Sequence, residues 1–477
     1  MMQRLSLIAL ALLVSSCMVG PDFESPEPDM PAEFYSSTEN AQGGGRTLEE
    51  LAWWELFQDP QLQSLIDTAL KNNLDVKGAL VAVETARARY GIERSNLFPT
   101  VDLFLGSERE NSSLLTDGND SISNTQELRF NIAWEVDLWG ARRRANEAAN
   151  AIYLSSSYAL VGTQLSLISE VADTYIGILA AKGRLQIREN TVFARERALV
   201  IADKRFQGGL TSKLEVQQSR VELAEARAGI VDIEQDIFQL QSRLSILLGE
   251  EPQAFGITSS LLDQELPEGL VAGVPVSILK NRPDMMQAEQ ALQEATARLG
   301  IAKAAYYPRL NITGELGFET EEFSDLLDSD GQKWLVGGEL LTPLFNAGRI
   351  RAEDKIAQLA LEQAGLDYQQ TLLDSLNEVS VALNRYHLSQ RRLSEREVLE
   401  EASRAYLILA IKRYRNGVLA YIDVLDAQRK LLDAELSVNE SKEIQLKSVV
   451  ELYRALGGGW QPEDVPVDIT AADMAGL

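Results

Sequence analysis

The chemistry open to this chain is limited by which reactive side chains it contains. Among 477 residues there is one histidine, His387, and one cysteine, Cys17. A structural zinc site needs four Cys or His ligands and disulfides need paired cysteines, so the chain cannot build either alone. A Ser/His/Asp triad could use only His387, and we find no glycine-rich phosphate loop, nucleophile elbow or metal-ligand spacing. The residues therefore point away from an enzyme and from a bound cofactor.

Two carboxylates have a spacing that could act electrostatically. Asp423 and Asp426 are three residues apart, so on a helix both side chains lie on one face. Carboxylates held close together attract cations, repel anions and oppose each other's approach. The chain has 71 acidic residues, and most such residues simply solvate an exposed helix face. A solvated face is therefore the ordinary alternative for this pair.

The charge balance excludes one class of partner. The chain has 45 Lys and Arg residues against 71 Asp and Glu residues, a formal net charge of −26. A nucleic-acid-binding protein needs a basic face to replace the counterions of the phosphates, so we expect no nucleic-acid partner. The hydrophobic content of 45% is too high for a disordered acidic chain.

The N-terminus indicates the compartment. A basic residue, Arg4, precedes an apolar run over residues 5–14, and two serines separate this run from Cys17. Residues 1–16 therefore read as an export signal. A cysteine at this position resembles a bacterial lipobox, which predicts a covalent lipid on Cys17; an ordinary signal peptide followed by an unpaired thiol is the alternative. One acyl anchor binds a membrane only marginally, so we expect a second element to hold the protein there.

The distribution of proline predicts very long helices. No proline lies between Pro99 and Pro252 or between Pro343 and Pro462, and both runs are rich in good helix formers. Within the first run, apolar residues recur at spacings of three and four over residues 230–247, which is typical of a coiled-coil seam. A helix from about residue 139 to 206 would be on the order of 100 Å long.

The two helical runs are copies of each other. Residues 205–210 (RFQGGL) align with 413–418 (RYRNGV) at a shift of 208, and residues 89–92 (RYGI) align with 298–301 (RLGI) at a shift of 209. Each copy is predicted to contain a helix, a short β region, a very long helix, a turn and a second helix. The glycines in these turns mark the points where each helical hairpin reverses.

Segments of alternating polarity lie between the helices. Apolar residues alternate with mostly polar ones over 128–138 and 310–318, and more weakly after Pro99 and over 334–344. Such strands of about 9–11 residues fit a membrane-spanning β-barrel, although a soluble sheet with one wet face is the commoner source of the pattern. We find no apolar stretch of about 18 residues outside the signal region that would predict a membrane-spanning helix. Four strands cannot close a barrel, so several copies would have to contribute strands.

Several segments together resemble the TolC-type outer-membrane efflux proteins, in the lipoprotein branch that serves resistance–nodulation–division pumps. The segments are 17–23 (CMVGPDF), 53–57 (WWELF), 59–62 (DPQL), 281–284 (NRPD) and 417–428 (GVLAYIDVLDAQ). The resemblance implies a mainly α fold with a transmembrane β-barrel portion. Three internally duplicated protomers would share a twelve-stranded barrel, four strands from each, continuous with an α-helical barrel. Shorter helices over about 60–96 and 281–304 would form an equatorial belt.

The resemblance and the repeat together predict the domain boundaries. Residues 1–16 are a signal peptide and 17–50 a lipid-anchored extended segment. The first repeat covers 51–253, with strands about 99–109 and 126–138 and a helical hairpin over 139–248. A linker over 254–272 follows. The second repeat covers 273–460, with a helix over 281–304, strands about 308–319 and 333–344, and a hairpin over 346–456. Residues 461–477 are a C-terminal tail.

The activity implied by the resemblance is passive and non-enzymatic. The chain would be the outer-membrane exit duct of a tripartite efflux system, conducting drugs or other small molecules from an inner-membrane pump of the resistance–nodulation–division type through a periplasmic adaptor (a membrane fusion protein). It would contact outer-membrane lipid, carry lipid on Cys17 and extend into the periplasm of a Gram-negative-type bacterium. The alternatives are a type I secretion duct and a lipid-anchored periplasmic coiled-coil scaffold or adaptor. A scaffold would leave the duplicated strands unexplained.

The resemblance also assigns roles to residues at the turn end of the hairpins. Asp423 and Asp426 would line the constricted periplasmic entrance, where a homotrimer would place six carboxylates around one axis. Glu215 is the first-repeat counterpart of Asp423, and in the family a carboxylate there bonds the tyrosine that matches Tyr414, which ties neighbouring hairpins shut. This chain has Glu where the relative compared has Asp. Candidate counter-charges and adaptor contacts complete the predicted site: Lys213, Arg413 and Arg415 for the first, and Gly208, Gly209, Gly417 and Leu419 for the second.

Overall fold

The computed structural model describes residues 18–28, 30, 58–113, 120–264, 266 and 281–460. The predicted signal peptide, Cys17, residues 53–57 and the predicted tail 461–477 lie outside the described residues. The chain divides into two compact units. Unit 1 comprises Met1–Glu27, Ala82–Ser156 and Gln287–Gln369, and unit 2 comprises Pro28–Val81, Ser157–Met286 and Gln370–Leu477.

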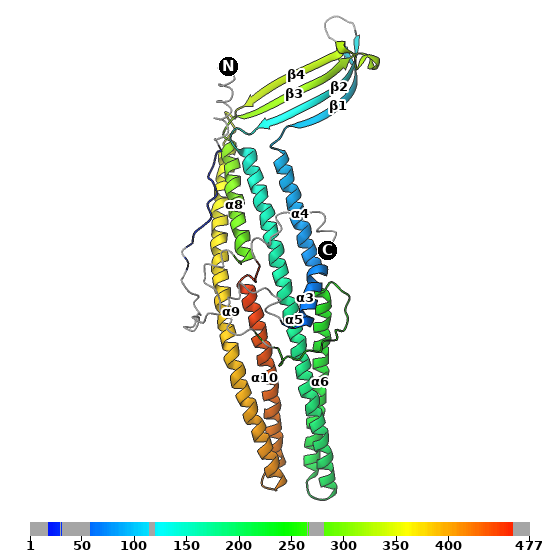
Figure 1. The fold of residues 1–477 in the computed structure, drawn as a ribbon, viewed down its shortest axis with the longest axis vertical. Coiled ribbons are helices and arrows are strands. Elements are labelled where there is room, and N and C mark those ends of the chain that lie inside the picture. The colour runs from blue at the N-terminus through cyan, green and yellow to red at the C-terminus, as the bar shows by residue number, and fades with distance from the viewer. Residues whose placement is uncertain are drawn as a thin grey trace. The chain divides into compact units, whose positions relative to one another are not determined.

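Unit 1 contains a four-stranded antiparallel sheet in the order β1-β2-β3-β4 (Figure 1). Its strands are β1 (Thr100–Ser113), β2 (Asp120–Val136), β3 (Arg309–Thr320) and β4 (Gln332–Leu341). The first repeat supplies the β1–β2 hairpin and the second supplies β3–β4, and the two hairpins join between β2 and β3. Strand β2 begins before residue 126, where the alternation becomes regular, because its pairing with β1 continues to Ser113 opposite Asp120.

The pairing register gives the sheet one apolar and one polar face. Leu103, Phe130, Leu316 and Trp334 lie opposite one another across the four strands, and all four are exposed large hydrophobic residues. Because side chains alternate along a strand, the next row lies on the other face, which is mainly polar: Asp102, Asn131 and Glu315 are followed by Leu335 on β4. Within the part of the chain that the structure describes, β1 and β4 are both edge strands.

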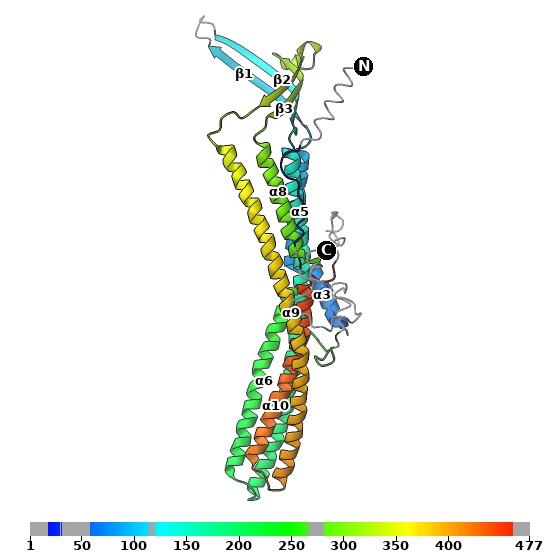
Figure 2. The same cartoon turned by 90° about the vertical axis from the view of Figure 1, so that its left-hand side faces the viewer.

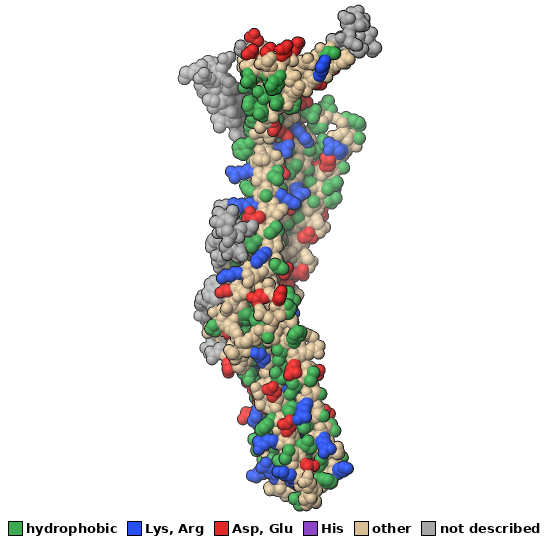
Figure 3. Space-filling model, turned by 90° about the vertical axis from the view of Figure 1, so that its right-hand side faces the viewer, with side chains coloured by type: hydrophobic (Ala, Val, Ile, Leu, Met, Phe, Trp, Pro, Cys, Tyr) green, Lys and Arg blue, Asp and Glu red, His purple; other side chains and the backbone are tan. Residues whose placement is uncertain are grey.

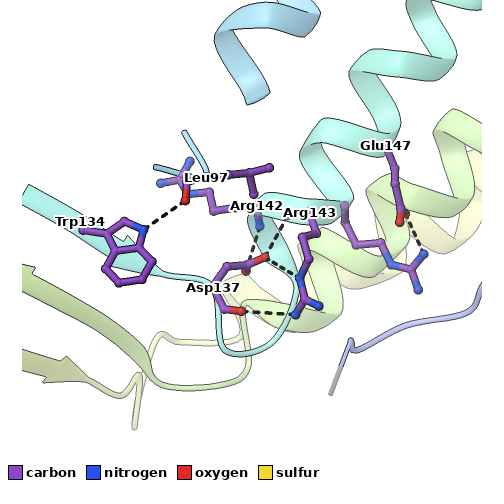
Figure 4. A network of polar contacts seen from close by, with 7 residues as sticks. Leu97, Trp134, Asp137, Arg142, Arg143 and Glu147 are labelled. Atoms are coloured by element: carbon purple, nitrogen blue, oxygen red, sulfur yellow. Dashed lines mark hydrogen bonds and ion pairs between the residues drawn. The ribbon is translucent and has the colours of Figure 1, made fainter. Parts of the chain in front are cut away.

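Helices begin where the strands of unit 1 end. The α5 helix (Ala141–Gln207) follows β2, and the Asp137 carboxylate accepts hydrogen bonds of 3.0 and 2.9 Å from the backbone N–H groups of Arg142 and Arg143 (Figure 4). This satisfies donors that a helix start otherwise leaves unpaired. The helices α4 (Leu74–Ser95), α8 (Pro283–Ala304) and α9 (Arg349–Arg415) supply the other helical parts of unit 1.

Unit 2 is a bundle of long helices that run side by side (Figure 2). It contains α3 (Pro60–Asn72), α6 (Lys213–Leu247), α10 (Tyr421–Ala455) and the longer parts of α5 and α9. Its core includes fully buried Tyr175, Ile178 and Leu179 on α5, Leu244 on α6 and Leu452 on α10. Burying such apolar stripes between helices is the main source of stability for helices this long.

One described helix, α5, contains an 18-residue window that is long and apolar enough to cross a membrane. The amino-acid pattern predicted no such stretch outside the signal region. That window is 44% buried inside the structure, so packing within the helical bundle accounts for part of its apolar character. By composition alone, a helix buried in a protein core resembles a membrane span.

Both helical hairpins of unit 2 reverse through the same backbone motif. Gly209 has φ +72° and Gly417 has φ +71°, and the following residues, Leu210 and Val418, donate hydrogen bonds back to Arg205 and Arg413. This is the Schellman arrangement, which ends a helix on a residue in the left-handed conformation. The two turns lie 208 residues apart, as the repeat predicts.

The glycines of the first turn differ in what they tolerate. Gly209→Ala is expected to lower the free energy of unfolding by about 1 kcal/mol, since a Cβ strains the left-handed conformation. Gly208→Ala should leave stability within about 0.5 kcal/mol, because a Cβ there meets only ordinary contacts and the equivalent residue is Asn416. Thermal melting of the helical circular dichroism signal measures both, and equal melting points would contradict the assignment.

Candidate gate site at the helical turns

The turn end of unit 2 brings residues of the two repeats into direct contact. Tyr414 lies in the last turn of α9 and Glu215 in the first turn of α6. The Tyr414 hydroxyl donates a hydrogen bond to Glu215 Oε1, and the Arg205 guanidinium lies over the Tyr414 ring, 5.0 Å from its centroid. Burial and the neighbouring Glu215 carboxylate raise the pKa of Tyr414 to about 12. The tyrosine is therefore a neutral hydrogen-bond donor at physiological pH.

A second contact between the repeats lies beside the first. The Tyr421 ring lies 5.5 Å from the Tyr414 ring, and its hydroxyl is 2.8 Å from Ser219 Oγ on α6. Burial raises the pKa of Tyr421, so this hydroxyl also stays protonated. The two tyrosines thus join the α9–α10 hairpin to the start of α6 through two neighbouring hydrogen bonds.

Farther from the turns, an ion-pair network connects three helices inside the bundle. Arg195 on α5 and Glu222 on α6 form a salt bridge of 3.0 Å, and each side chain is only 5% exposed. Arg429 on α10 binds the other oxygen of Glu222, and Gln428 accepts a hydrogen bond from Arg195. Burial lowers the pKa of Arg195, although the charge of Glu222 opposes this effect. Removing one partner of an ion pair buried this deeply leaves an uncompensated charge, which strongly destabilises the fold.

This network was not among the functional residues predicted from the sequence. The sequence feature that could have indicated it is an acidic residue on the buried face of α6. Glu222 lies there among the buried residues Val216, Ser219, Leu223 and Ala226. An acidic residue within an apolar helical stripe indicates a buried partner. The sequence does not say which of the chain's many Lys and Arg residues that partner is.

The predicted pore acids each have a partner in the same chain. The Asp423 carboxylate accepts a hydrogen bond of 3.2 Å from the backbone N–H of Ala420, and thereby caps the start of α10. Asp426 forms a 2.8 Å ion pair with Lys430 and accepts a 3.3 Å hydrogen bond from the Tyr406 hydroxyl. The bond and charge of Lys430 lower the pKa of Asp426, so this carboxylate is ionised at neutral pH.

The candidate counter-charges lie at the surface of the turn end. Lys213, Arg413 and Arg415 are exposed, and within the described residues none of them forms an ion pair with Asp423 or Asp426. Within one protomer, Arg205 lies over the Tyr414 ring and Lys430 pairs with Asp426. On the face drawn in Figure 3, Lys and Arg side chains gather around the turn end of the bundle. Basic residues also suit the C-terminal ends of α5 and α9, where the helix dipole is negative.

The predicted adaptor-contact residues lie at the turn surface with one exception. Gly208, Gly209 and Gly417 are exposed, whereas Leu419 is half-buried and packs against a core of Ala410, Val424 and Ala427. Two repeat-related pairs of exposed apolar side chains lie beside the turns. Leu210 and Val418 form one pair, and Leu214 and Ile422 form the other.

Comparison with known proteins places this architecture in a family. The sequence pattern of the family described as "Outer membrane efflux protein" matches residues 65–250 and 274–458, one match in each repeat. The chain belongs to the outer membrane efflux protein family. The probable efflux pump outer membrane protein TtgC of Pseudomonas putida is 31% identical over 464 residues, covering 96% of this chain and 95% of TtgC. The cation efflux system protein CusC of Escherichia coli O157:H7 is 28% identical over 463 residues, covering 95% and 98%.

Solved structures of efflux-protein channels share the fold. The outer-membrane channel OprN has a TM-score of 0.88 at 29% identity, over 94% of this chain and all of the matched chain. The open-state MtrE channel of Neisseria gonorrhoeae has a TM-score of 0.85 at 27% identity, over 93% and 99%. The predicted mainly helical fold with four antiparallel strands and an internal duplication is confirmed, as is a non-enzymatic efflux protein of the Gram-negative outer membrane.

Proposed function

We propose that this chain is the outer-membrane channel of a tripartite efflux system, an exit duct supplied by an inner-membrane transporter and a periplasmic adaptor. The observation that carries the proposal is the combination, in one chain, of an uncovered amphipathic sheet and duplicated helical hairpins. Relatives named as outer membrane proteins of efflux pumps support it. We place the pump in the resistance–nodulation–division class on the sequence resemblance.

The sheet supports assembly into a shared barrel. Its apolar face is uncovered, and a membrane strand directs such a face to lipid and its polar face to the lumen. Both edge strands would leave unpaired backbone groups in a bilayer, which is untenable unless the sheet closes. Three copies would give twelve strands and pair β1 of one copy with β4 of the next. A homotrimer would therefore pair the backbone groups of the edge strands, which a single chain leaves unpaired.

The helices of unit 2 also expose apolar side chains that a second copy would cover. On α6, Val231 and Phe238 are seven residues apart and exposed, and on α9 the exposed pairs Val398–Leu399 and Ile408–Leu409 follow one another. A soluble surface rarely displays so many large apolar residues along one helix. Packing between protomers around a helical tube would bury them.

The experiment is to purify the full-length protein in detergent and measure its oligomeric mass and its conductance in planar bilayers. We expect a trimer that forms discrete ion channels and that still requires detergent after its lipid is removed. A monomer that stays in solution without detergent and forms no channels would support the scaffold alternative instead. Relatives named for toluene, antibiotic and cation efflux favour small molecules over exported proteins as cargo.

Within this channel we infer that the turn end is the periplasmic gate. The Tyr414–Glu215 hydrogen bond would hold the α9–α10 hairpin against α6 in the closed state, and an open state would break it. The exposed pairs Leu210–Val418 and Leu214–Ile422, with the glycine turns, offer an apolar surface to an adaptor. We also infer that Cys17, which lies outside the described residues, carries the acyl anchor.

The proposed aspartate ring predicts a change in ion selectivity. Asp423→Asn with Asp426→Asn is expected to lower the cation-over-anion permeability ratio by about twofold or more, because a trimer loses six negative charges near its axis. Asparagine keeps an acceptor for the Ala420 N–H group, so the α10 cap survives. The control is Asp433→Asn with Glu440→Gln, which removes two exposed charges elsewhere on α10. If the permeability ratio is unchanged in the ring variant, or falls equally in the control, the two aspartates do not set the selectivity of the gate.

A further inference from the structure

The eight residues that follow the predicted lipid attachment site lie against the rest of unit 1 through several specific contacts. We call residues 18–25 the strap. The Val19 N–H group donates a 3.0 Å hydrogen bond to the carbonyl of Trp139, in the connection between β2 and α5. At the other end, the Ser25 hydroxyl donates a 2.6 Å hydrogen bond to Glu289 on α8. The strap thus reaches from the strand–helix junction to the side of a neighbouring helix.

Glycine permits a very close approach at two points along the strap. Gly20 has φ +101°, and a Cβ there would lie 2.6 Å from the Cα of Gly300 on α8. Gly140 has φ +83°, and a Cβ there would lie 2.4 Å from Cγ of Met18. Real Cβ atoms do not approach other atoms so closely, so a larger residue at either position would push the strap away.

An ion pair fastens the middle of the strap. The Arg144 side chain, in the first turn of α5, is only 4% exposed, and its guanidinium binds Asp22 of the strap at 2.7 Å. A second nitrogen of the guanidinium binds Glu147, on its own helix, at 2.8 Å. The Asp22 carboxylate is 82% exposed, so it meets a buried cation from the solvent side. Charge-assisted hydrogen bonds to a buried guanidinium are among the stronger polar contacts in proteins.

We infer that residues 18–25 are a docked strap that holds the acyl-bearing end of the chain at the strand–helix junction, with the Arg144–Asp22 pair as its main fastening. This rests on the proposed function, because it takes Cys17 to carry lipid. Cys17 is bonded to Met18, so a docked Met18 restricts the acyl chains to the bilayer surface beside the strands. The weak hold of one anchor then adds to that of the barrel, since both engage the same membrane.

The internal repeat supplies a natural comparison. The first-repeat equivalent of Gly300 is Gly91 on α4, and a Cβ at Gly91 would meet nothing within 4 Å. A Cβ at Gly300 would lie 2.9 Å from Nε, Cγ and Cδ of Arg144. The chain has a single N-terminus, so only one of the two equivalent helices receives a strap. The side chain that crowds Gly300 is the one that binds Asp22 of the strap, so an alanine at Gly300 would displace Arg144 from its place beside the strap.

The experiment is hydrogen–deuterium exchange on the full-length lipoprotein in detergent, followed in the peptide that contains residues 18–25. Asp22→Asn is expected to speed exchange in this peptide about tenfold, because the strap loses its charged fastening. Glu147→Gln is the matched control: it removes the other partner of Arg144 and leaves the strap pair in place. Exchange at the wild-type rate in Asp22→Asn, or equal acceleration in Glu147→Gln, would overturn the inference.

A second pair of variants tests the strap without changing any charge. Gly300→Ala should speed exchange of the same peptide, whereas Gly91→Ala should leave it unchanged, since alanine suits an open helical site. An unchanged rate in Gly300→Ala would contradict the close docking. Conductance and oligomeric mass, measured on the same samples, report separately on the channel. A wild-type protein with a protected strap and no channel activity would refute the proposed function and leave the docking intact.

Discussion

Glu222→Ala is expected to lower the free energy of unfolding of the helical bundle by about 3–5 kcal/mol, because it leaves the Arg195 guanidinium buried without its counter-ion. The measurement is thermal melting of the helical circular dichroism signal in detergent, with the wild type under the same conditions. Burial already lowers the pKa of Arg195, and the charge of Glu222 offsets that effect. Removal of Glu222 therefore exposes the full cost of burying this cation.

Two further variants distinguish the loss of the buried ion pair from a general effect of substitution on helix α6. Glu225→Ala changes an exposed acid on the same helix and should alter stability by no more than about 0.5 kcal/mol. Arg195→Met combined with Glu222→Leu replaces the buried pair with apolar side chains and should recover most of the loss, while the half-exposed Arg429 stays in contact with water. If the Glu222→Ala and Glu225→Ala variants melt at the same temperature, the network does not stabilise the bundle.

Tyr414→Phe is expected to raise the conductance of the resting channel. The variant loses a hydrogen bond to a charged acceptor, worth about 1.5–3 kcal/mol, so the ratio of open to closed states should rise by about 10- to 100-fold. The fold should persist, because the equivalent residue of the first repeat is Phe206 and the ring can still stack beneath Arg205. Planar-bilayer recordings of spontaneous current give the measurement.

The control is Tyr406→Phe, which removes a longer, 3.3 Å hydrogen bond to the exposed Asp426 and should change the resting current little. Equal resting currents in the wild type and in Tyr414→Phe would show that the Tyr414–Glu215 hydrogen bond does not hold the channel closed. The pH dependence adds a check. The pKa of Tyr414 rises from 10.0 to about 12 in the closed state. The hydrogen bond donated by the protonated hydroxyl therefore stabilises the closed state fully below pH 10, and this stabilisation is lost as the pH rises through about 12. Tyr414 should therefore contribute no pH dependence to the resting current below pH 10.

The contact between Tyr414 and Glu215 was predictable because both residues lie beside turns that the repeat aligns. The repeat located the turns, the turns placed the ends of α6 and α9, and the family resemblance named the pair. The roles predicted for Lys213, Arg413 and Arg415 depend on the direction and reach of long side chains, which no spacing determines. In the structure Arg205 of α5 lies over the Tyr414 ring of α9, a contact set by packing between helices, whereas Lys430 pairs with Asp426 at i,i+4 on the same helix.

The buried network and the strap show the same limit. The apolar stripe of α6 could have indicated that Glu222 is buried, but its partners lie 27 and 207 residues away on α5 and α10. The strap joins Asp22 to Arg144 across 122 residues. Before folding, any of many basic residues could satisfy either acid.

The amino-acid sequence by itself determined the architecture: proline-free apolar periodicity produces long helices, alternation produces strands, and duplication repeats both. These patterns act over a few residues, because helix and strand periods are properties of the local backbone. Only the tertiary structure decided which acid meets which base, which glycine is crowded and which edges of the sheet stay open. Such contacts depend on the packing of segments far apart in the chain, where a shift of one helical turn changes every partner.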